Sequence, residues 1–395
     1  MHKFIWLVSG QTISLRRWIA GGAIALWVFL SGCSLPRVSA EERIFLTVSL
    51  DFLDAYELPN VEFEDTPVRG LSGITYDRAR DRIYAVSDDR GDRAPARFYT
   101  LTFTVGQTED NRPCIDGVEV ETVTFLLNEM GDTFAPGTVD PEGIAVSPRQ
   151  SVFISSEGVA DDGIPPFIDE FDLETGQWKS RLPVPERYLP RTVDDQAQGV
   201  RDNRGFEALT LKAAGFRSGE PFRVFSAIEE PLQQDPLPEE DGQSSPGRIL
   251  HYVVGDERSL LIAEHLYPID PEPPGAVING LVELVALDLG GHFLSLERSF
   301  GIFGNGARIF QLAMGGATDT SGMTQFGTNL GRIQPVQKRL LLDLTDLDIS
   351  LDNLEGMTLG PRLPDGTQSV VLVSDDNFNE TQVTQFLLFR LQGVQ

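Results

Sequence analysis

Acidic side chains recur at matched places in five short β-rich segments of this 395-residue sequence. In each copy one residue opens an apolar run, and an acidic position closes the apolar run that follows it. The opening residues are Ser72, Glu142, Glu207, Glu283 and Glu355. The closing positions are Asp88 or Asp89, Glu157, Glu229 or Glu230, Glu297, and Asp375 or Asp376. Such a pattern could gather carboxylates from distant parts of the chain into one site.

Several carboxylates that lie within a few ångströms of one another cannot all stay ionised unless a positive group joins them. One candidate is a hard cation, because Ca²⁺ suits a site built from oxygen ligands. The other candidate is arginine, since arginines flank the same positions: Arg69, Arg90, Arg93, Arg97, Arg201, Arg204 and Arg298. The pattern leaves open whether the acidic residues form a cation site or pair with arginine and backbone groups as structural elements. The sequence contains no Asp-x-Asp-x-Asp-Gly loop, so a calcium site must be assembled from separate segments.

Two strands joined by a tight turn would position each pair of residues. Turn-forming residues separate the two apolar runs, as in Ser147-Pro148-Arg149-Gln150. In an antiparallel hairpin, the residue that opens the first strand lies opposite the residue that closes the second. Glu142 and Glu157 are centred on this turn, so we expect them to face each other at one end of the hairpin.

The hairpin recurs about every 70 residues, which indicates a repeat architecture. An alternating segment, such as residues 97–103, adds a third strand to each copy, and the first four copies add a fourth. The fifth copy ends near Gln395 without a fourth strand, but the strand-like residues 43–50 precede the first copy. We therefore predict an all-β fold, a β-propeller of four-stranded blades closed by pairing the N-terminal strand with the C-terminal blade. Five blades are favoured, with six as the alternative if one long loop contains a degenerate blade.

In such a propeller the first strand of each blade runs along the central channel. The recurring acidic positions would then form a ring at one mouth of that channel. No helical periodicity longer than two turns follows the N-terminal segment, which supports the all-β prediction.

The N-terminal segment has the features of a secretory signal. Residues 1–32 carry three basic residues, no acidic residue, and an apolar run at 18–30. The sequence Leu30-Ser31-Gly32-Cys33 resembles the lipobox of bacterial lipoproteins, in which the cysteine is lipidated after cleavage. An uncleaved signal anchor is the alternative.

We accordingly predict a signal peptide at 1–32, a short tether at 33–42 and one propeller domain at 43–395. The signal predicts secretion across the inner membrane and a lipid anchor on Cys33 in the bacterial cell envelope, in the periplasm or at the outer membrane. Cys33 would be the only point of contact with the membrane. Lipidation of Cys33 would leave Cys114 as the only free thiol, so no disulfide within the mature chain is expected.

Composition and motifs exclude several other functions. The chain has 32 Lys and Arg against 59 Asp and Glu, a net charge of −27, which would repel the phosphate backbone of nucleic acids. No Gly-x-Ser-x-Gly elbow occurs, and His251, His265 and His292 are scattered, so neither a serine esterase nor a zinc site is supported. We expect a monomer.

Two motifs near the ends of the repeat region resemble a known family. Asn353-Leu354-Glu355-Gly356-Met357, followed by Val373-Ser374-Asp375-Asp376-Asn377-Phe378, resembles the closing signature of the phytase-like proteins, named for an "esterase-like activity of phytase". Leu71-Ser72-Gly73-Ile74 and Ser87-Asp88-Asp89-Arg90-Gly91 are similar to the opening signature. Asp140-Pro141-Glu142-Gly143, Gly205-Phe206-Glu207-Ala208 and Leu296-Glu297-Arg298 lie between them in the expected order. The resemblance covers about residues 60–392.

The resemblance implies a secreted or envelope propeller that hydrolyses a small phosphoester with the assistance of calcium, while basic residues orient the substrate. The predicted catalytic residues are Glu142, Glu207, Glu355, Arg69, Arg90 and Arg204. The predicted metal-binding residues are Asp88, Asp89, Glu142, Glu157, Glu207, Glu283, Glu355, Asp375 and Asp376. The alternative is a non-catalytic envelope propeller that binds a ligand or a protein partner.

Overall fold

A computed structural model of the chain describes residues 44–212, 219–238, 242–287, 290–327 and 330–393. The predicted signal peptide, the tether and Cys33 lie outside the described residues. Residues 45–395 cluster as one compact unit. Within the described residues, no helix has the length and hydropathy needed to cross a membrane.

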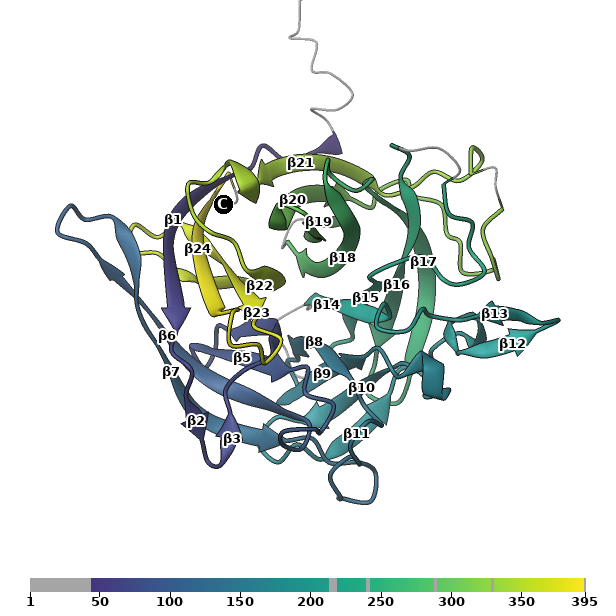
Figure 1. Cartoon of the computed structure of the whole chain (residues 1–395), viewed down its shortest axis with the longest axis horizontal. Coiled ribbons are helices and arrows are strands. Elements are labelled where there is room, and N and C mark those ends of the chain that lie inside the picture. The colour runs from purple at the N-terminus through teal and green to yellow at the C-terminus, as the bar shows by residue number, and fades with distance from the viewer. Residues whose placement is uncertain (1–43, 213–218, 239–241, 288–289, 328–329, 394–395) are drawn as a thin grey trace, which may run out of the picture. The chain divides into compact units, whose positions relative to one another are not determined.

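Five four-stranded antiparallel sheets are arranged around a central axis as the blades of a β-propeller (Figure 1). Blade 1 comprises β4 (Leu71–Asp77), β5 (Arg82–Ser87), β6 (Arg97–Gln107) and β7 (Pro113–Phe125). Blade 2 comprises β8 (Pro141–Val146), β9 (Ser151–Ser156), β10 (Phe167–Asp172) and β11 (Trp178–Arg181). Blade 3 comprises β14 (Phe206–Lys212), β15 (Phe222–Ile228), β16 (Ser245–Val254) and β17 (Ser259–Ile269). The prediction of an all-β propeller with five blades is confirmed.

The last two blades follow in chain order. Blade 4 comprises β18 (Ala276–Ala286), β19 (His292–Gly301), β20 (Gly304–Ala313) and β21 (Gln337–Asp343). Blade 5 comprises β22 (Asn353–Arg362), β23 (Gln368–Asp375), β24 (Thr384–Gln392) and β1 (Ser49–Leu58). Small two-stranded sheets, β2 (Glu62–Phe63) with β3 (Thr66–Pro67) and β12 (Arg191–Val193) with β13 (Gln196–Gln198), extend from loops. The described helical turns are the short 3₁₀ segments η1 (Ala160–Asp162), η2 (Glu186–Tyr188) and η3 (Leu344–Asp346).

Pairing of β1 with β24 closes the ring, with Ser49 opposite Gln392 and Leu58 opposite Thr384. The N-terminal strand therefore pairs with the C-terminal blade as predicted, but it lies later in the chain than residues 43–50. The segment 51–57 contains the acidic residues Asp51, Asp54 and Glu57. They lie among Leu50, Leu53 and Leu58, whose buried side chains fill the two interfaces that blade 5 forms with its neighbours.

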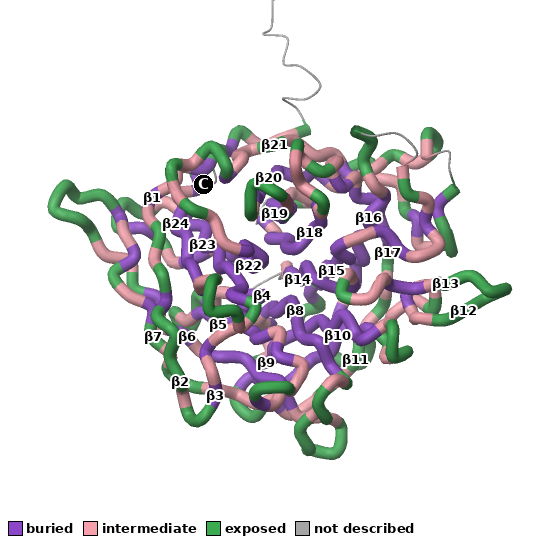
Figure 2. Tube along the Cα trace, in the orientation of Figure 1, coloured by how far each residue is buried: buried purple, intermediate pink, exposed green. Residues whose placement is uncertain are grey.

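The core is divided among the blade interfaces. Five clusters of buried apolar side chains lie one between each pair of neighbouring blades, as with Ile144 and Tyr84 between blades 1 and 2. Most of the inner-hairpin strands are buried on both faces, so they read as nearly continuous apolar runs. Figure 2 shows this as a mostly buried centre surrounded by exposed loops.

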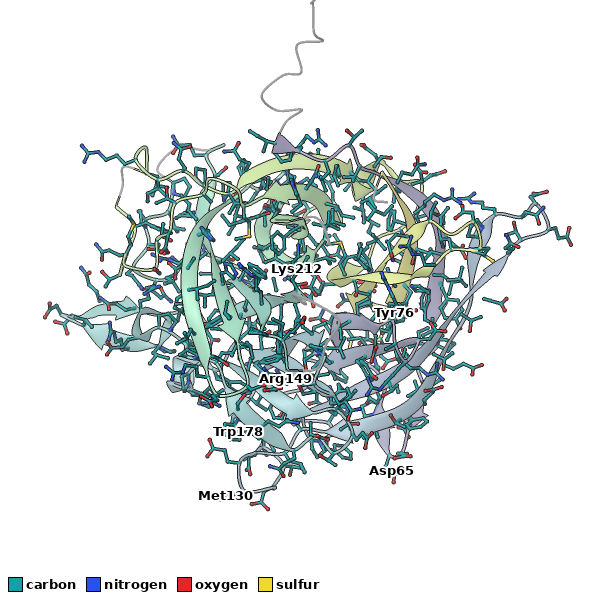
Figure 3. All side chains as sticks on the ribbon, turned by 180° about the vertical axis from the view of Figure 1, so that it is seen from behind. Asp65, Tyr76, Met130, Arg149, Trp178 and Lys212 are labelled. Atoms are coloured by element: carbon teal, nitrogen blue, oxygen red, sulfur yellow. The ribbon has the colours of Figure 1, made fainter. Side chains whose placement is uncertain are left out.

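The innermost strands β4, β8, β14, β18 and β22 contact one another in sequence around the channel. Each begins at the same mouth of the channel and runs toward the opposite face. Tyr76 in β4 and Lys212 in β14 lie near the far ends of their strands, and both are labelled in the rear view (Figure 3). The first residues of these strands are therefore gathered at one mouth.

Candidate functional site

Every inner hairpin has a β-bulge near the mouth of the channel, and this bulge sets which side chains reach the mouth. The bulge follows the first pair of the ladder in blades 1, 2 and 3, the second pair in blade 5 and the pair of Leu281 with Glu297 in blade 4. A bulge re-aims a side chain because it puts two residues opposite one. The bulged residues of blades 1, 2, 3 and 5 are Ser72, Glu142, Glu207 and Glu355. The closing residues at the ends of the second strands are Asp88, Glu157, Glu229 and Asp375. Opening and closing carboxylates lie near each other in blades 2, 3 and 5, as predicted. In blade 1 the hydroxyl of Ser72 instead donates to the backbone carbonyl of Glu142 at 3.0 Å.

A cavity of about 770 Å³ opens at this mouth. The carboxylates that line it include Asp88, Asp140, Glu142, Glu207, Glu355 and Asp375, and the arginines are Arg90, Arg93, Arg204 and Arg298. The lining therefore combines oxygen ligands for a cation with guanidinium groups that can bind an anion.

Two overlapping groups of carboxylates are closely packed at the floor of the site. Asp140, Glu142 and Glu157 each offer an oxygen within 4.8 Å of the others, and so do Glu157, Glu207 and Glu229. All five residues are buried, and Glu157 belongs to both groups. One Glu157 oxygen accepts a hydrogen bond from the backbone N–H of Gly205 (2.6 Å), while the other, Oε2, is buried without a partner.

Burial raises the pKa of Glu142, Glu157 and Glu207 well above the ordinary value, and repulsion from neighbouring carboxylates adds to the effect. The pKa of Asp88 and that of Asp375 are raised in the same way, mainly by burial and then by repulsion from Asp375 and Glu355 respectively. The structure gives these groups too few positive partners to stay ionised together. A bound cation would supply the missing charge.

Three arginines neutralise part of the acidic site. Arg298 contacts Glu229 at 2.9 Å and Glu355 at 3.4 Å, and these carboxylates hold its pKa above the ordinary value although burial opposes the charged form. Arg204 binds the other oxygen of Glu229 at 2.9 Å. Arg90 binds Asp140 at 2.5 Å. Arginine bridges, one of the two alternatives left open by the sequence, are therefore present at the mouth, beside carboxylates that could hold a cation.

Blade 4 departs from the predicted pattern by one residue. In its inner hairpin, Leu281 lies opposite Glu297 and the bulge falls at Val282, so Arg298 occupies the place that a carboxylate takes in the other blades. The predicted facing of Glu283 and Glu297 is wrong, because the bulge turns both residues away from the mouth. Glu297 instead binds Lys338 of its own blade at 2.5 Å and the hydroxyl of Tyr267 in blade 3 at 2.8 Å.

Glu283 is buried within the channel wall rather than at the cavity. Its Oε1 accepts hydrogen bonds from the backbone N–H groups of Leu209 (3.1 Å) and Leu284 (2.8 Å). Burial raises the pKa of Glu283 well above the ordinary value. The structure does not bring this predicted metal-binding residue to the two carboxylate groups.

In the two acidic pairs at the ends of β5 and β23, the second residue organises a loop. Asp89 accepts hydrogen bonds from four backbone N–H groups at residues 91–94 and from Arg97 at 2.8 Å. These donors hold the pKa of Asp89 below the ordinary value although burial opposes this. Asp376 binds Arg69 at 2.6 Å and accepts from the backbone N–H of Gly70. The oxygens of Asp89 and Asp376 are already used by these hydrogen bonds and ion pairs. Asp88 and Asp375 are therefore the members of the two pairs that could still bind a ligand.

The predicted residue Arg69 does not line the cavity, because it is held by Asp376 and by the exposed Glu380 at 3.0 Å. Three further residues of the site, Asp140, Glu229 and Arg298, were not among the predicted catalytic or metal-binding residues, although the repeat placed Glu229 and Arg298 near the mouth. Asp140 directly precedes Pro141-Glu142, and Glu229 is the first of an acidic pair. An alignment that allowed a bulge in each hairpin would have found all three.

The histidines lie away from the cavity. His251 and His265 are on β16 and β17 with ring centroids 6.5 Å apart, and His251 stacks on Phe225 at 4.2 Å. Burial lowers the pKa of His251 to about 4, so this imidazole is neutral near pH 7. These contacts agree with structural roles.

The carboxylates at the floor are suited to a hard cation. All donors in the two groups are oxygens, and oxygens on opposite sides of a Ca²⁺ ion are separated by about 5 Å, which agrees with the spacing found here. Glu157 Oε2, in the residue that belongs to both groups, is buried without a partner, and so is Oδ1 of Asp88 at the same mouth. The buried acidic groups could therefore hold a metal.

A family model described as "Phytase-like: Esterase-like activity of phytase" matches residues 66–378. No curated protein matches the sequence at a significant level. Among solved structures, an endo-arabinase from Bacteroides thetaiotaomicron covers 83% of this chain and 97% of its own, with 11% identity and a TM-score of 0.42. The catalytic domain of an α-L-arabinofuranosidase from Coprinopsis cinerea covers 87% and 97%, with 11% identity and a TM-score of 0.35. Similarities this low carry no argument about function.

Proposed function

Because the chain belongs to the phytase-like family, we propose that the cavity at the channel mouth is the active site of a calcium-assisted phosphoester hydrolase. The observation that carries this proposal is the shared carboxylate Glu157, with one buried oxygen unpartnered, at the junction of two groups of three carboxylates. Glu142, Glu157, Glu207, Glu229 and Asp140 would hold the cation. When bound, calcium neutralises phosphate oxygens and lowers the pKa of water.

The arginines of the lining would bind and orient the substrate. Arg90, Arg204 and Arg298 reach the cavity from three different blades, and each is already fixed by a carboxylate of the site. A guanidinium held in this way is preorganised to donate to phosphate oxygens. Glu355, beside Arg298 at 3.4 Å, and Glu207 line the same cavity and would help to position the attacking water.

The test is hydrolysis of a generic phosphomonoester and of phytate by the purified protein, with calcium and with a chelator. We expect turnover that requires calcium and falls at least about 100-fold in Glu157→Gln. Glu380→Gln is the matched control, since Glu380 is an exposed acid near the mouth that the cavity does not use. Absence of metal-dependent turnover with both substrates would overturn the proposal. Calcium binding without turnover would favour the alternative, a non-catalytic binding module.

We further propose that the protein acts in the bacterial cell envelope as a monomer anchored through lipidated Cys33. The support is the signal and lipobox pattern of residues 1–33. Metabolic labelling with a fatty acid, compared between the natural chain and Cys33→Ser, tests this anchor. Label retained by the Cys33→Ser chain would contradict it.

A further inference from the structure

Blade 4 extends farther at the mouth of the channel than any other described blade. Its inner strand β18 begins at Ala276, five residues before Leu281, the residue that precedes the bulge. The corresponding strands of the other blades begin at that place or one residue before it: β4 at Leu71, β8 at Pro141, β14 at Phe206 and β22 at Asn353. Blade 4 therefore forms a wall that stands above the acidic floor. Its strands β18, β19 and β20 are the nested, strongly curved ribbons near the centre of Figure 1.

The register of blade 4 shows which side chains this wall presents. Phe300 lies opposite both Ile278 and Asn305, so the three residues form one row across β18, β19 and β20. Phe300 is two residues after Arg298, and alternate residues of a strand share a face. The row therefore lies directly above Arg298, on the face that Arg298 uses to reach the cavity. Ile278, Phe300 and Asn305 all line the cavity, and Phe300 is 46% exposed.

A further apolar side chain reaches the cavity from the β23–β24 loop of blade 5. Phe378 lines the cavity, and the guanidinium of Arg93 lies 5.6 Å from the centre of its ring. Its backbone has φ 49°, a left-handed conformation that is unusual for a large residue, and its N–H donates to Asp376 at 3.1 Å. A Cβ on Gly70 would lie 2.4 Å from the ring, so this glycine is required for the ring to sit where it does. Such a constrained placement points to a use for the ring at the mouth.

Most charges of the cavity lie on its floor, and Arg93 lies beside Phe378 at the rim. Arg298 lies on the floor side of Phe300, and the carboxylates of Glu142, Glu157 and Glu207 on the floor are buried. A ligand that fills both parts must carry one compact anionic group and one hydrocarbon group. A polyol with many phosphates would instead place some of its anionic groups against Ile278 and Phe300, where no positive charge would balance them.

We infer that the substrates are phosphomonoesters of apolar alcohols, in which the phosphate lies on the arginine and carboxylate floor and the alkyl or aryl group lies against Ile278, Phe300 and Phe378. This inference rests on the proposed function. In the reaction, the oxygen of water bonds to phosphorus while the bond from phosphorus to the alcohol oxygen breaks. The alcohol leaves with one proton of the water, and inorganic phosphate is the other product.

The test compares ligands that differ only in hydrocarbon length. Calorimetry with ethylphosphonate and hexylphosphonate, which cannot be hydrolysed, is carried out on the purified protein in calcium. We expect hexylphosphonate to bind at least about ten-fold more tightly, because the four added methylenes are partly buried on the wall. In Phe300→Ser the ratio should fall to about two-fold, while binding of ethylphosphonate stays the same. Phe303→Ser is the matched control: Phe303 is an exposed aromatic residue between β19 and β20 that does not line this cavity.

Equal binding of the two phosphonates, no binding of either, or a ratio unchanged in Phe300→Ser would overturn the inference. Thermal unfolding of each variant shows whether it is folded. Parallel assays with ethyl and hexyl phosphate, whose leaving groups are equally reactive, separate this inference from the proposed function. Preference for hexylphosphonate without turnover of either ester would leave the apolar site standing and overturn the hydrolase. Turnover of both esters at equal kcat/KM would support the hydrolase and overturn the apolar site.

Discussion

Two buried groups of charged side chains in this propeller differ in how their charge is balanced. Outside the channel, Arg248 binds Asp235 through two nitrogens at 2.7 and 2.8 Å and Glu264 through a third at 2.5 Å. Arg187 and the hydroxyl of Tyr188 also bind Glu264, at 2.5 and 2.7 Å. Two carboxylates thus meet two guanidinium groups, and each has several hydrogen-bond partners.

The mouth of the channel contains more carboxylate than guanidinium. Its arginines with a carboxylate partner are Arg90, Arg204 and Arg298. The carboxylates are Asp88, Asp140, Glu142, Glu157, Glu207, Glu229, Glu355 and Asp375. Since burying an unpaired charge is unfavourable, a fold selected only for stability would balance this site as it balances Arg248. The Arg248 group is thus a balanced structural network, whereas the mouth has an excess of buried carboxylates that could hold a metal.

Replacing Arg248, the positive residue of the balanced group, should have the largest effect. Arg248→Met leaves Asp235 and Glu264 buried with an excess of negative charge, so we expect a loss of about 3–5 kcal/mol in the free energy of unfolding. Denaturant unfolding measures this loss. Arg82→Met, which breaks a partly exposed pair with Glu121, should leave the unfolding midpoint nearly unchanged. Equal effects of the two substitutions would remove the distinction between the groups.

Removing a carboxylate from the mouth should abolish stabilisation by calcium. At a calcium concentration of 100 times Kd, the natural protein should gain about 2.7 kcal/mol in the free energy of unfolding. Glu157→Gln should lose most of this gain, because Glu157 belongs to both carboxylate groups. Thermal unfolding with and without calcium provides the measurement, with Glu380→Gln as the control. A calcium effect that survives Glu157→Gln would place the ion elsewhere.

The carboxylates at the mouth should also make the stability of the protein depend on pH. Burial raises the folded-state pKa of Glu142, Glu157 and Glu207, so the folded protein holds more protons than the unfolded chain above about pH 4.5. Stability without metal should therefore fall as pH rises above this value, by about 1.4 kcal/mol per pH unit for each extra proton. Unfolding in a chelator at several pH values tests this, and saturating calcium should flatten the curve.

Asp89 acts in the opposite direction. Its pKa is lowered by Arg97 and backbone donors, so the stability it contributes is present above the ordinary carboxyl pKa and is lost as pH falls. Replacement by Asn should remove that loss at low pH. A stability that rises with pH throughout the range in a chelator would contradict the assignment of the mouth as under-neutralised.

The smallest effect is expected at the exposed rim. Glu380→Gln removes a partner of Arg69 whose side chain is 84% exposed, and exposed pairs contribute little. The free energy of unfolding should change by less than about 0.5 kcal/mol. Asp376→Asn, which alters the buried partner of the same arginine, should cost more in the same denaturant assay. Equal changes would show that burial does not determine the value of a pair in this protein.

Much of the architecture is readable from the sequence because apolar alternation and spaced acids repeat with each blade. In blades 2, 3 and 5 the expected carboxylates do meet at the mouth, but each opening residue is bulged and has no partner in the ladder. The register of blade 4 was not predicted, because a bulge adds one residue without changing composition, and Glu283 and Glu297 resembled the expected pair.

The acidic pairs show a second limit of the sequence. Adjacent residues such as Asp88 and Asp89 are chemically equal, but a strand end points them in opposite directions. Both line the cavity, but Oδ1 of Asp88 has no partner, whereas Asp89 accepts from backbone N–H groups and from Arg97. Only the three-dimensional path of the loop separates a residue available to a ligand from one already used by the fold.

Closure of blade 5 has a consequence for how the chain is made. Strand β1 is among the first parts of the propeller to be synthesised, yet its partner β24 is nearly the last. Until β24 emerges, β1 exposes unpaired backbone groups, and blades 1 and 4 lack the neighbour that covers their apolar faces. The ring can therefore close only after β24 has been synthesised. A nascent chain that loses its final strand would be a substrate for proteases, however complete its other blades are.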